Sequence, residues 1–382
     1  MKKFFLLFFV LLLEASIFAQ NIERVLTVDE CIKCALNINH DILLSKTSIA
    51  FAEQRAKEVK TLYFPTIDIN FNLSRYSNDF ATVINSNYLP VTILLPEGSR
   101  DYFYSTRIAL WQNIYNGGRI IATNRLAKIN QEQVQNKLDT TKNEVVAKVK
   151  IQFYKNISIK TKIEIYKKYL SNKVNILLQE QLEMLQHEYE LEMFNLLALI
   201  GLELDTVIDI EGHIKPQKLD LNLQQCLLWA YKFRPEIKTT QYQETMDNIS
   251  VNLINMERYP TVKIGASYDW LGDDKNSSEK DWYVSLNINY PIFDGGAIFA
   301  RLKQKKIKAR QATIERSKIE EKIKLEVRKA FSDYIFWDNK VIKIKDMKAT
   351  NIEQELLKED IKYNYIKSLV NLDLAIGKNI DI

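Results

Sequence analysis

The stretch YPIFDGGAIFARLKQKKIKARQ, residues 290–311, joins a strand-like segment to a long run that has neither glycine nor proline. A second stretch, WQNIYNGGRIIATNRLAKINQ at residues 111–131, has the same design. A glycine pair separates the two parts in each, Gly117-Gly118 in one and Gly295-Gly296 in the other. Because glycine adopts backbone angles that other residues avoid, these pairs predict joints where a strand turns into a helix.

Two similar halves follow one another along the chain. Residues 27–66 align with residues 222–261 at a constant offset of 195, whereas the two glycine pairs lie 178 residues apart. Self-similarity at a fixed offset is typical of a repeated structural unit. The difference (195 minus 178) gives the first half a loop that is 17 residues longer. We place it within residues 78–100, a segment rich in Asn, Pro and Ser, and expect an exposed loop there.

The repeat predicts the organisation of the whole chain. We expect a signal peptide at residues 1–19, a first repeat at 20–201, a linker at 202–221 and a second repeat at 222–382. The first repeat should contain helices at about 27–62, 119–171 and 173–200 and strands at about 66–76 and 103–114. The second should contain helices at about 222–258, 297–349 and 351–376 and strands at about 261–270 and 282–292. Turns of the helical hairpins are placed at Ser171-Asn172 and Thr350-Asn351, because Asn favours turns.

The N-terminus has the pattern of a secretory signal peptide. Two lysines precede ten apolar residues at positions 4–13, and Ala19 precedes the expected cleavage site. No later run reaches the eighteen or so apolar residues typical of a transmembrane helix. The net charge of +5 is too small to indicate a nucleic-acid-binding protein.

The four expected strands alternate polar and apolar residues, and aromatic residues cluster near their ends. Alternation predicts a sheet with one polar and one apolar face. A soluble sandwich would show the same pattern, but strands of about ten residues, aromatic ends and a signal peptide favour a membrane barrel. The polar residues that we expect to face a lumen are Asp68, Asn70, Asn72, Arg107, Lys263, Ser267, Asp269, Ser285, Asn287 and Asn289.

Residues that could carry catalysis are sparse. The three histidines stand apart, and no zinc-hydrolase or nucleophile-elbow motif is present. Cys31 and Cys34 form a C-x-x-C motif inside an expected helix, where burial as small apolar residues is favoured over redox or metal chemistry. The glycine pairs lack the Lys-Ser/Thr that a phosphate-binding loop requires. We therefore expect neither an enzyme nor a cofactor or metal site.

Taken in order, the motifs resemble the TolC-like outer-membrane efflux protein family over essentially the whole mature chain. The segments that carry the resemblance are LTVDECIKCAL at 26–36, YFPT at 63–66, PIFDGG at 291–296 and EVRKAF at 326–331. The resemblance implies a homotrimer in the outer membrane of a Gram-negative-type cell. Three four-stranded chains would form a twelve-stranded barrel, continued by a periplasmic α-helical barrel.

The same resemblance implies partners: a periplasmic adaptor (membrane fusion) protein, an inner-membrane pump or ABC exporter, and outer-membrane lipid. The role would be a passive exit duct in efflux or type I secretion. One departure is that neither helical hairpin has the glycine-containing tip usual in the family, so we expect shortened tips. Two alternatives remain open: a periplasmic coiled-coil adaptor or scaffold, and a shortened family member that does not conduct.

Overall fold

The structure is a computed structural model, and it describes residues 24–75, 83–86, 89–94, 102–171, 175–214, 221–273, 278–345 and 351–378. The expected signal peptide lies outside these residues. The chain forms two compact units, each described by itself below. We call residues 1–50, 132–242 and 313–382 the helical unit, and residues 51–131 and 243–312 the sheet unit. Four helices, α3, α4, α7 and α8, contain the boundaries between them.

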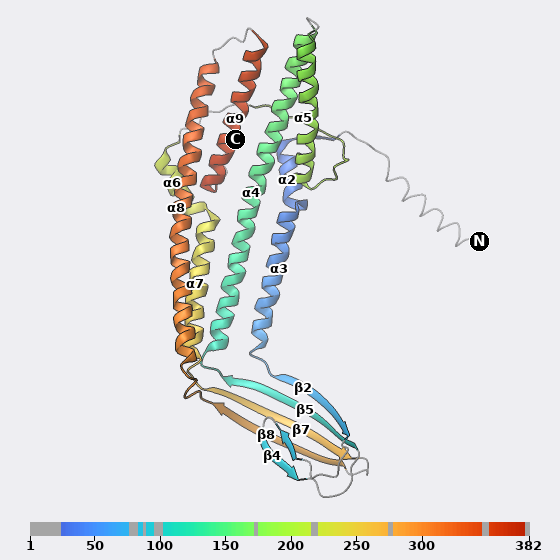
Figure 1. Ribbon diagram of the computed structural model, residues 1–382, viewed down its shortest axis with the longest axis vertical. Coiled ribbons are helices and arrows are strands. Elements are labelled where there is room, and N and C mark those ends of the chain that lie inside the picture. Colours follow the sequence, from blue (N-terminus) through green and yellow to red (C-terminus); the bar gives the residue numbers. More distant parts are fainter. Residues whose placement is uncertain are drawn as a thin grey trace, which may run out of the picture. The chain divides into compact units, whose positions relative to one another are not determined.

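The elements of the first half follow the order helix, strand, helix (Figure 1). They are β1 Arg24–Leu26, α2 Val28–Ile38, α3 His40–Thr61, β2 Thr66–Arg75, β3 Val83–Ser86, β4 Leu89–Leu94, β5 Tyr102–Tyr115, α4 Arg119–Leu170 and α5 Ile176–Ile200. The second half has β6 Ile208–Ile210, α6 Leu223–Phe233, α7 Pro235–Met256, β7 Thr261–Asp273, β8 Ser278–Asn289, α8 Ala297–Lys345 and α9 Ile352–Ile376.

The single helices expected at 27–62 and 222–258 are wrong, because each is two helices. Asn39 interrupts the first with extended backbone; its side chain accepts from the N–H of Asp41 and donates to the carbonyl of Leu199. Arg234 interrupts the second, immediately before Pro235. Proline disfavours helical backbone in the residue before it but suits the first turn of a new helix.

Two further expectations need correction. The insert at 78–100 is not only a loop, because β3 and β4 pair within it as an antiparallel hairpin. The linker at 202–221 contains β6, which pairs in parallel with β1. The expected turn residue Asn172 lies outside the described residues, and Asn175 is instead the residue that caps α5. Asn351 caps α9, so the equivalent asparagines are 176 residues apart (351 minus 175).

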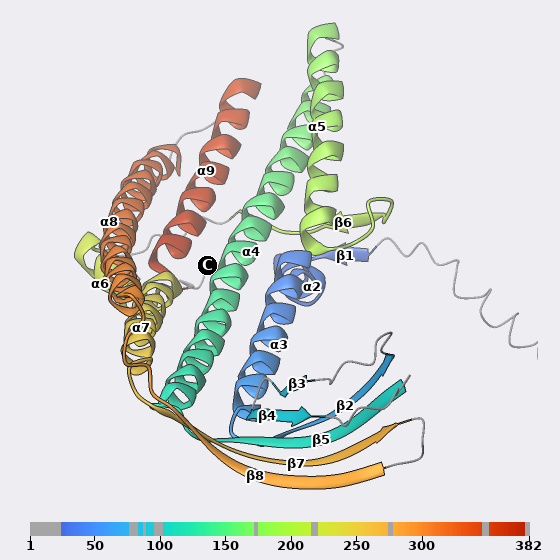
Figure 2. The ribbon, with the colours of Figure 1, turned by 60° about the horizontal axis from the view of Figure 1, so that its bottom comes forward.

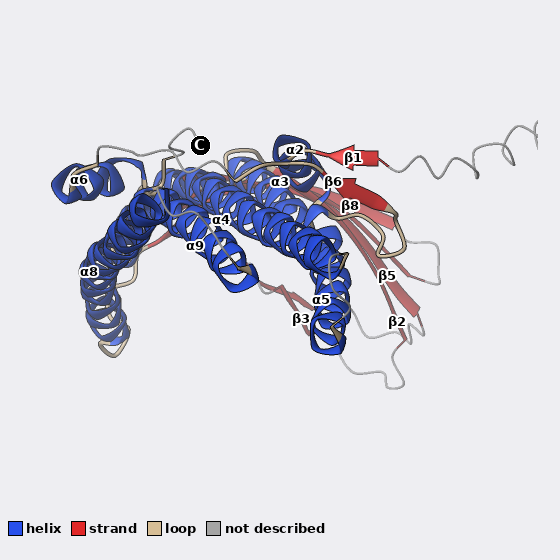
Figure 3. Ribbon diagram, turned by 90° about the horizontal axis from the view of Figure 1, so that it is seen from above, coloured by secondary structure: helices blue, strands red, loops and turns tan. Residues whose placement is uncertain are grey.

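The helical unit is held together by two apolar clusters. One gathers Leu26, Cys31, Val149 and Leu196, among others, from α2, α4, α5 and the β1–β6 pair. The other joins α6, α8 and α9, and Ala147 of α4 belongs to it. Figure 3 shows α9 running beside α4, where Lys162 forms an ion pair with Asp360. Among the described residues, no helix combines the length and the apolar character needed to cross a membrane.

The sheet unit contains a four-stranded antiparallel sheet in the order β2-β5-β7-β8. These strands bend together into a curved surface (Figure 2). The contact between the two halves of the chain is the pairing of β5 with β7, so β2 and β8 are the edge strands among the described residues. Edge strands expose unpaired backbone N–H and C=O groups.

Candidate functional site

The strand register places all ten expected lumen residues on one face of the sheet. Asn70 lies opposite Arg107, and Arg107 lies opposite Asp269. Lys263 lies opposite Asn287 on the same face. Directly paired residues share a face, and residues two apart along a strand return to it. We call this surface the polar face.

The opposite face is apolar and uncovered. Ile67, Ile69, Phe71 and Leu73 of β2 and Trp282, Val284, Leu286 and Ile288 of β8 are each 59–69% exposed. Soluble monomers rarely leave a continuous apolar patch of this extent open to water. An apolar outer band is, however, what a strand in contact with lipid requires.

An ion pair lies in the middle of the polar face. Arg107 Nε donates to Asp269 Oδ1 at 2.5 Å across the β5–β7 pair. Ser267 Oγ donates to the other carboxylate oxygen at 3.0 Å, and the Asp269 residue is only 7% exposed. Two donors therefore satisfy this carboxylate, as a half-buried charge requires. The register continues the row from Asn70 through this pair to Asp281.

Two aromatic side chains cover glycines across the strands. A Cβ at Gly265 would lie 2.3 Å from the Trp111 ring, and one at Gly272 would lie 2.1 Å from Tyr104. Trp111 interrupts the polar side of β5, and the register gives the reason: it lies over a glycine of β7. The sequence expectation missed both pairs, since only the register reveals them; the glycines within an expected strand were the available signal.

The glycine pairs lie where the strands end and the long helices begin. All four glycines have positive φ: +67° and +81° at Gly117 and Gly118, and +70° and +88° at Gly295 and Gly296. The preceding side chains cap the helices. Asn116 Oδ1 accepts from the N–H of Ile120 at 3.4 Å. Asp294 accepts from the N–H groups of Gly296 and Ile298 at 3.0 and 2.7 Å.

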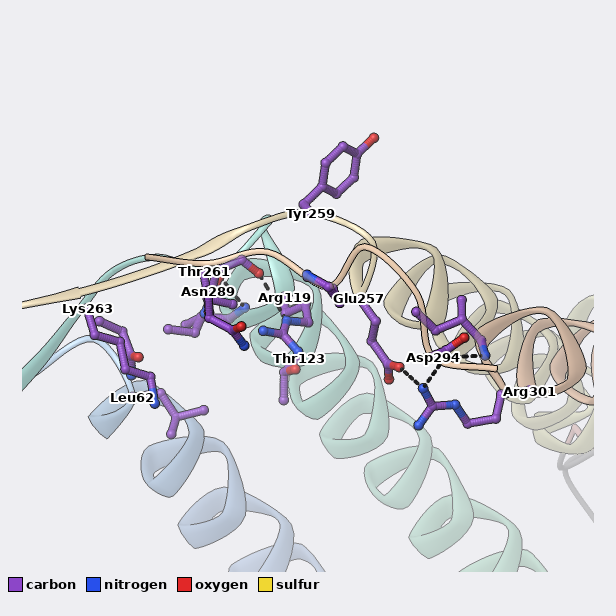
Figure 4. A pocket seen from close by; sticks show the side chains of 15 residues that line it. Leu62, Arg119, Thr123, Glu257, Tyr259, Thr261, Lys263, Asn289, Asp294 and Arg301 are labelled. Carbon is purple, nitrogen blue, oxygen red and sulfur yellow. Dashed lines mark hydrogen bonds and ion pairs between the residues drawn. The ribbon is translucent and has the colours of Figure 1, made fainter. Parts of the chain in front are cut away.

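A polar pocket of about 620 Å³ lies between these joints and the strand ends (Figure 4). Glu257 and Asp294 lie on either side of Arg301, at 2.8 and 3.8 Å from its Nη2. The pocket is open and charged, and it contains no arrangement of nucleophile and base. The described residues include no group of three His, Cys, Asp or Glu that could hold a metal.

The cysteines are buried in the helical unit. Cys31 and Cys226, which are 195 residues apart (226 minus 31), are both fully buried, and burial raises the pKa of Cys31 to about 12. Burial also raises the pKa of Cys226. Because the thiolate is the reactive and metal-binding form, these pKa directions argue against chemistry at the C-x-x-C motif.

Solved structures share this fold. The outer-membrane channel OprN matches with a TM-score of 0.71 at 14% identity, over 92% of this chain and 90% of that one. The Campylobacter jejuni CmeC outer membrane channel matches with a TM-score of 0.66 at 16% identity, over 92% and 85%. The Neisseria gonorrhoeae MtrE outer membrane channel, in its open state, matches with a TM-score of 0.68 at 13% identity, over 92% and 89%.

The sequence itself matches no family model and no curated protein, so the likeness rests on the fold. It extends over nearly the whole of this chain and of those channels. The resemblance to the TolC-like outer-membrane efflux proteins is thereby confirmed in its structural content, and the fold of this chain is the fold of outer-membrane channels.

Proposed function

We propose that this chain is an outer-membrane channel, the exit duct of a tripartite efflux or type I secretion system in a Gram-negative-type cell. The observation that carries the proposal is the sheet with one polar face, one exposed apolar face and two open edges. The shared fold of known outer-membrane channels supports it. Such a duct is passive, and it has no need of a catalytic residue or a cofactor.

The open edges supply the argument for a trimer. Unpaired backbone groups are not tolerated in the hydrocarbon core of a bilayer, so β2 and β8 must pair with other strands there. Three copies of the tandem-repeat protomer would give a closed barrel of twelve strands. The outer surface would be the exposed apolar face, in contact with lipid, and the ten polar-face residues would line the lumen.

The long helices would continue the duct into the periplasm. α4 has 52 residues and α8 has 49, which correspond to about 78 and 74 Å at a rise of about 1.5 Å per residue. A periplasmic adaptor and an inner-membrane pump or ABC exporter are the proposed partners. Because the hairpins lack the usual glycine tips, we propose that the tips dock an adaptor through residues particular to this chain.

Planar-bilayer recording of the purified mature chain tests the proposal. We expect stepwise conductance, and we expect Asn287→Asp on the polar face to increase cation selectivity about two-fold or more by placing charge beside the ions. Ile288→Leu, the next residue along β8 on the apolar face, is the matched control and should leave selectivity unchanged. No conductance from folded, membrane-inserted protein would favour the non-conducting alternative, and release of the chain by osmotic shock would favour the periplasmic scaffold.

A further inference from the structure

The second half of the chain covers one side of α4 in the helical unit. Asn136 Nδ2 donates to Thr239 Oγ1 of α7 at 2.9 Å, and Gln133 Nε2 donates to the carbonyl of Thr239 at 3.1 Å. Further along α4, Ala147 is 6% exposed and belongs to the apolar cluster of α6, α8 and α9. Ala147 and Val370 of α9 line the same small cavity.

Helix ends show which residues are equivalent in the two halves. α2 and α6 begin 195 residues apart (223 minus 28), and so do α3 and α7 (235 minus 40). α4 and α8 begin 178 apart (297 minus 119), and α5 and α9 both begin and end 176 apart (352 minus 176, 376 minus 200). These offsets relate Ala147 to Leu325, Val370 to Phe194, Asn136 to Ile314 and Thr239 to Leu44.

The equivalent positions are apolar and exposed. Leu325 is 53% exposed, where Ala147 is 6%. Phe194 is 40% exposed, where Val370 is 1%. Ile314 and Leu44 are 59% and 65% exposed. The first half therefore carries one surface on α3 and α5, and the second half carries the complementary surface on α8, with nothing covering either among the described residues.

We propose that a second copy of this chain covers α8 in the same way as the second half covers α4. Leu325 then packs against Phe194 of the partner subunit, and Ile314 packs against Leu44 of the partner subunit. The occupant is a copy of the chain because the chain itself carries both surfaces, each built on the elements that make the contact within it. A contact between two different surfaces, repeated from copy to copy, closes into a ring. This inference rests on the proposed channel and names the side chains that join its protomers.

The chemistry of the two contacts differs. Within the chain the Asn136–Thr239 contact is polar, whereas the equivalent contact between copies is the apolar pair Ile314 and Leu44. Exchanging the two would place Asn136 against leucine and leave its amide unsatisfied, which costs about 1–3 kcal/mol. The difference favours pairing each helix with its own neighbour and disfavours the exchanged arrangement.

Native mass spectrometry of the detergent-purified protein gives the first test. We expect Leu325→Asp and Phe194→Asp each to lower the trimer fraction at least ten-fold while circular dichroism keeps its helical signal. Leu228→Asp is the matched control: Leu228 is 68% exposed on α6, and its equivalent, Lys33, is also exposed. Trimers as stable as the parent in both variants would overturn the inference and leave the channel proposal standing. A parent chain that is monomeric in detergent and in vesicles would overturn both.

Mixed cross-linking identifies the contact itself. Leu325→Cys is placed in one chain and Phe194→Cys in another, both with Cys34→Ser, because Cys31 and Cys226 are buried. A short bismaleimide applied to the co-expressed chains should give a covalent dimer of the two. Leu228→Cys replaces Leu325→Cys as the control and should give no dimer. Equal yields from both pairs, or none from the first in a trimer, would contradict the proposed contact.

Discussion

The strand-to-helix joints of the two halves have matching backbones and different neighbours. At Gly117 an added Cβ would lie 2.8 Å from Tyr259 Cβ and 2.9 Å from the Met256 carbonyl oxygen. At Gly295 it would meet nothing within 4 Å in this chain. The positive φ is thus a local requirement at both joints, whereas close packing at the first joint comes from the other half of the chain. The same difference recurs along α4 and α8.

Alanine substitution at the joints should give the largest contrast. Gly117→Ala combines left-handed strain of about 1–2 kcal/mol with overpacking of about 1–3 kcal/mol, so we expect a loss of about 3 kcal/mol in unfolding free energy. Gly295→Ala has only the strain, about 1–2 kcal/mol. Guanidinium unfolding followed by circular dichroism measures both. An equal loss at the two sites in the assembled protein would show that a neighbouring copy closes the second joint as Met256 and Tyr259 close the first.

The helix breaks of the two halves should come next. Arg234 forms ion pairs with Glu236 and Glu326 at 2.7 and 2.9 Å and donates to the carbonyl of Ala375 at 3.2 Å. Its counterpart Asn39 makes the one equivalent bond, to the carbonyl of Leu199 at 2.8 Å.

Arg234→Ala should therefore cost about 2–3 kcal/mol, since bonds to charged groups are the stronger ones, and Asn39→Ala about 1 kcal/mol. Thermal unfolding of the two variants measures the difference, with Arg234→Lys as a control that keeps the charge and loses the fork geometry. A larger loss at Asn39 than at Arg234 would contradict this ranking.

Acid should affect the first half more than the second. Burial raises the pKa of Glu192, but hydrogen bonds from Lys155, Gln152 and Asn195 outweigh it and lower the pKa from its ordinary 4.5 to about 2. A lowered pKa in the folded state means that the stabilisation is present above pH 4.5 and is lost as the pH falls toward 2. The counterpart on α9 is Ser368, which donates to the carbonyl of Tyr365 and does not titrate.

Hydrogen exchange of α5 should therefore accelerate between pH 4.5 and 2 relative to α9, by a free-energy change on the order of 1 kcal/mol. Exchange rates are first corrected for their intrinsic pH dependence. Glu192→Gln should reduce this pH dependence while keeping the shape of the side chain. A variant that responds to acid like the parent would assign the effect to another group.

The caps of α4 and α8 should differ least. Asp294→Ala removes a charged acceptor from two N–H groups, and Asn116→Ala removes a neutral acceptor from one. We expect losses of about 1 and about 0.5 kcal/mol, because a carboxylate also interacts favourably with the helix dipole. Asp294→Asn is the control that separates the charge from the hydrogen bonds. Indistinguishable unfolding midpoints for Asp294→Asn and Asp294→Ala would attribute the whole effect to charge.

Local chemistry decided what could be foreseen from the sequence. The period-two alternation of residues such as Ile67 and Ile69 predicted the two faces of the sheet, and the glycine pairs predicted the joints, because both are properties of short segments. The break at Arg234 also had a local signal, in Pro235, that the expected single helix did not take into account. The break at Asn39 had a weaker one, because its partner is the distant carbonyl of Leu199.

Features that depend on distant partners were not foreseen. Trp111 covers Gly265 only because β5 pairs with β7 in a particular register. β6 pairs with β1, about 180 residues away along the chain, and neither strand is longer than three residues. Short strands of this kind have no periodicity to read, so only the fold identifies them.

The two open edges of the β2-β5-β7-β8 sheet bear on how the protein reaches its destination. A lone protomer would carry unsatisfied amide and carbonyl groups into oil, so entry into the bilayer has to be a collective step taken by several newly exported chains together. Its yield should therefore rise much more steeply than linearly with expression level, and solitary chains should wait in the care of periplasmic chaperones.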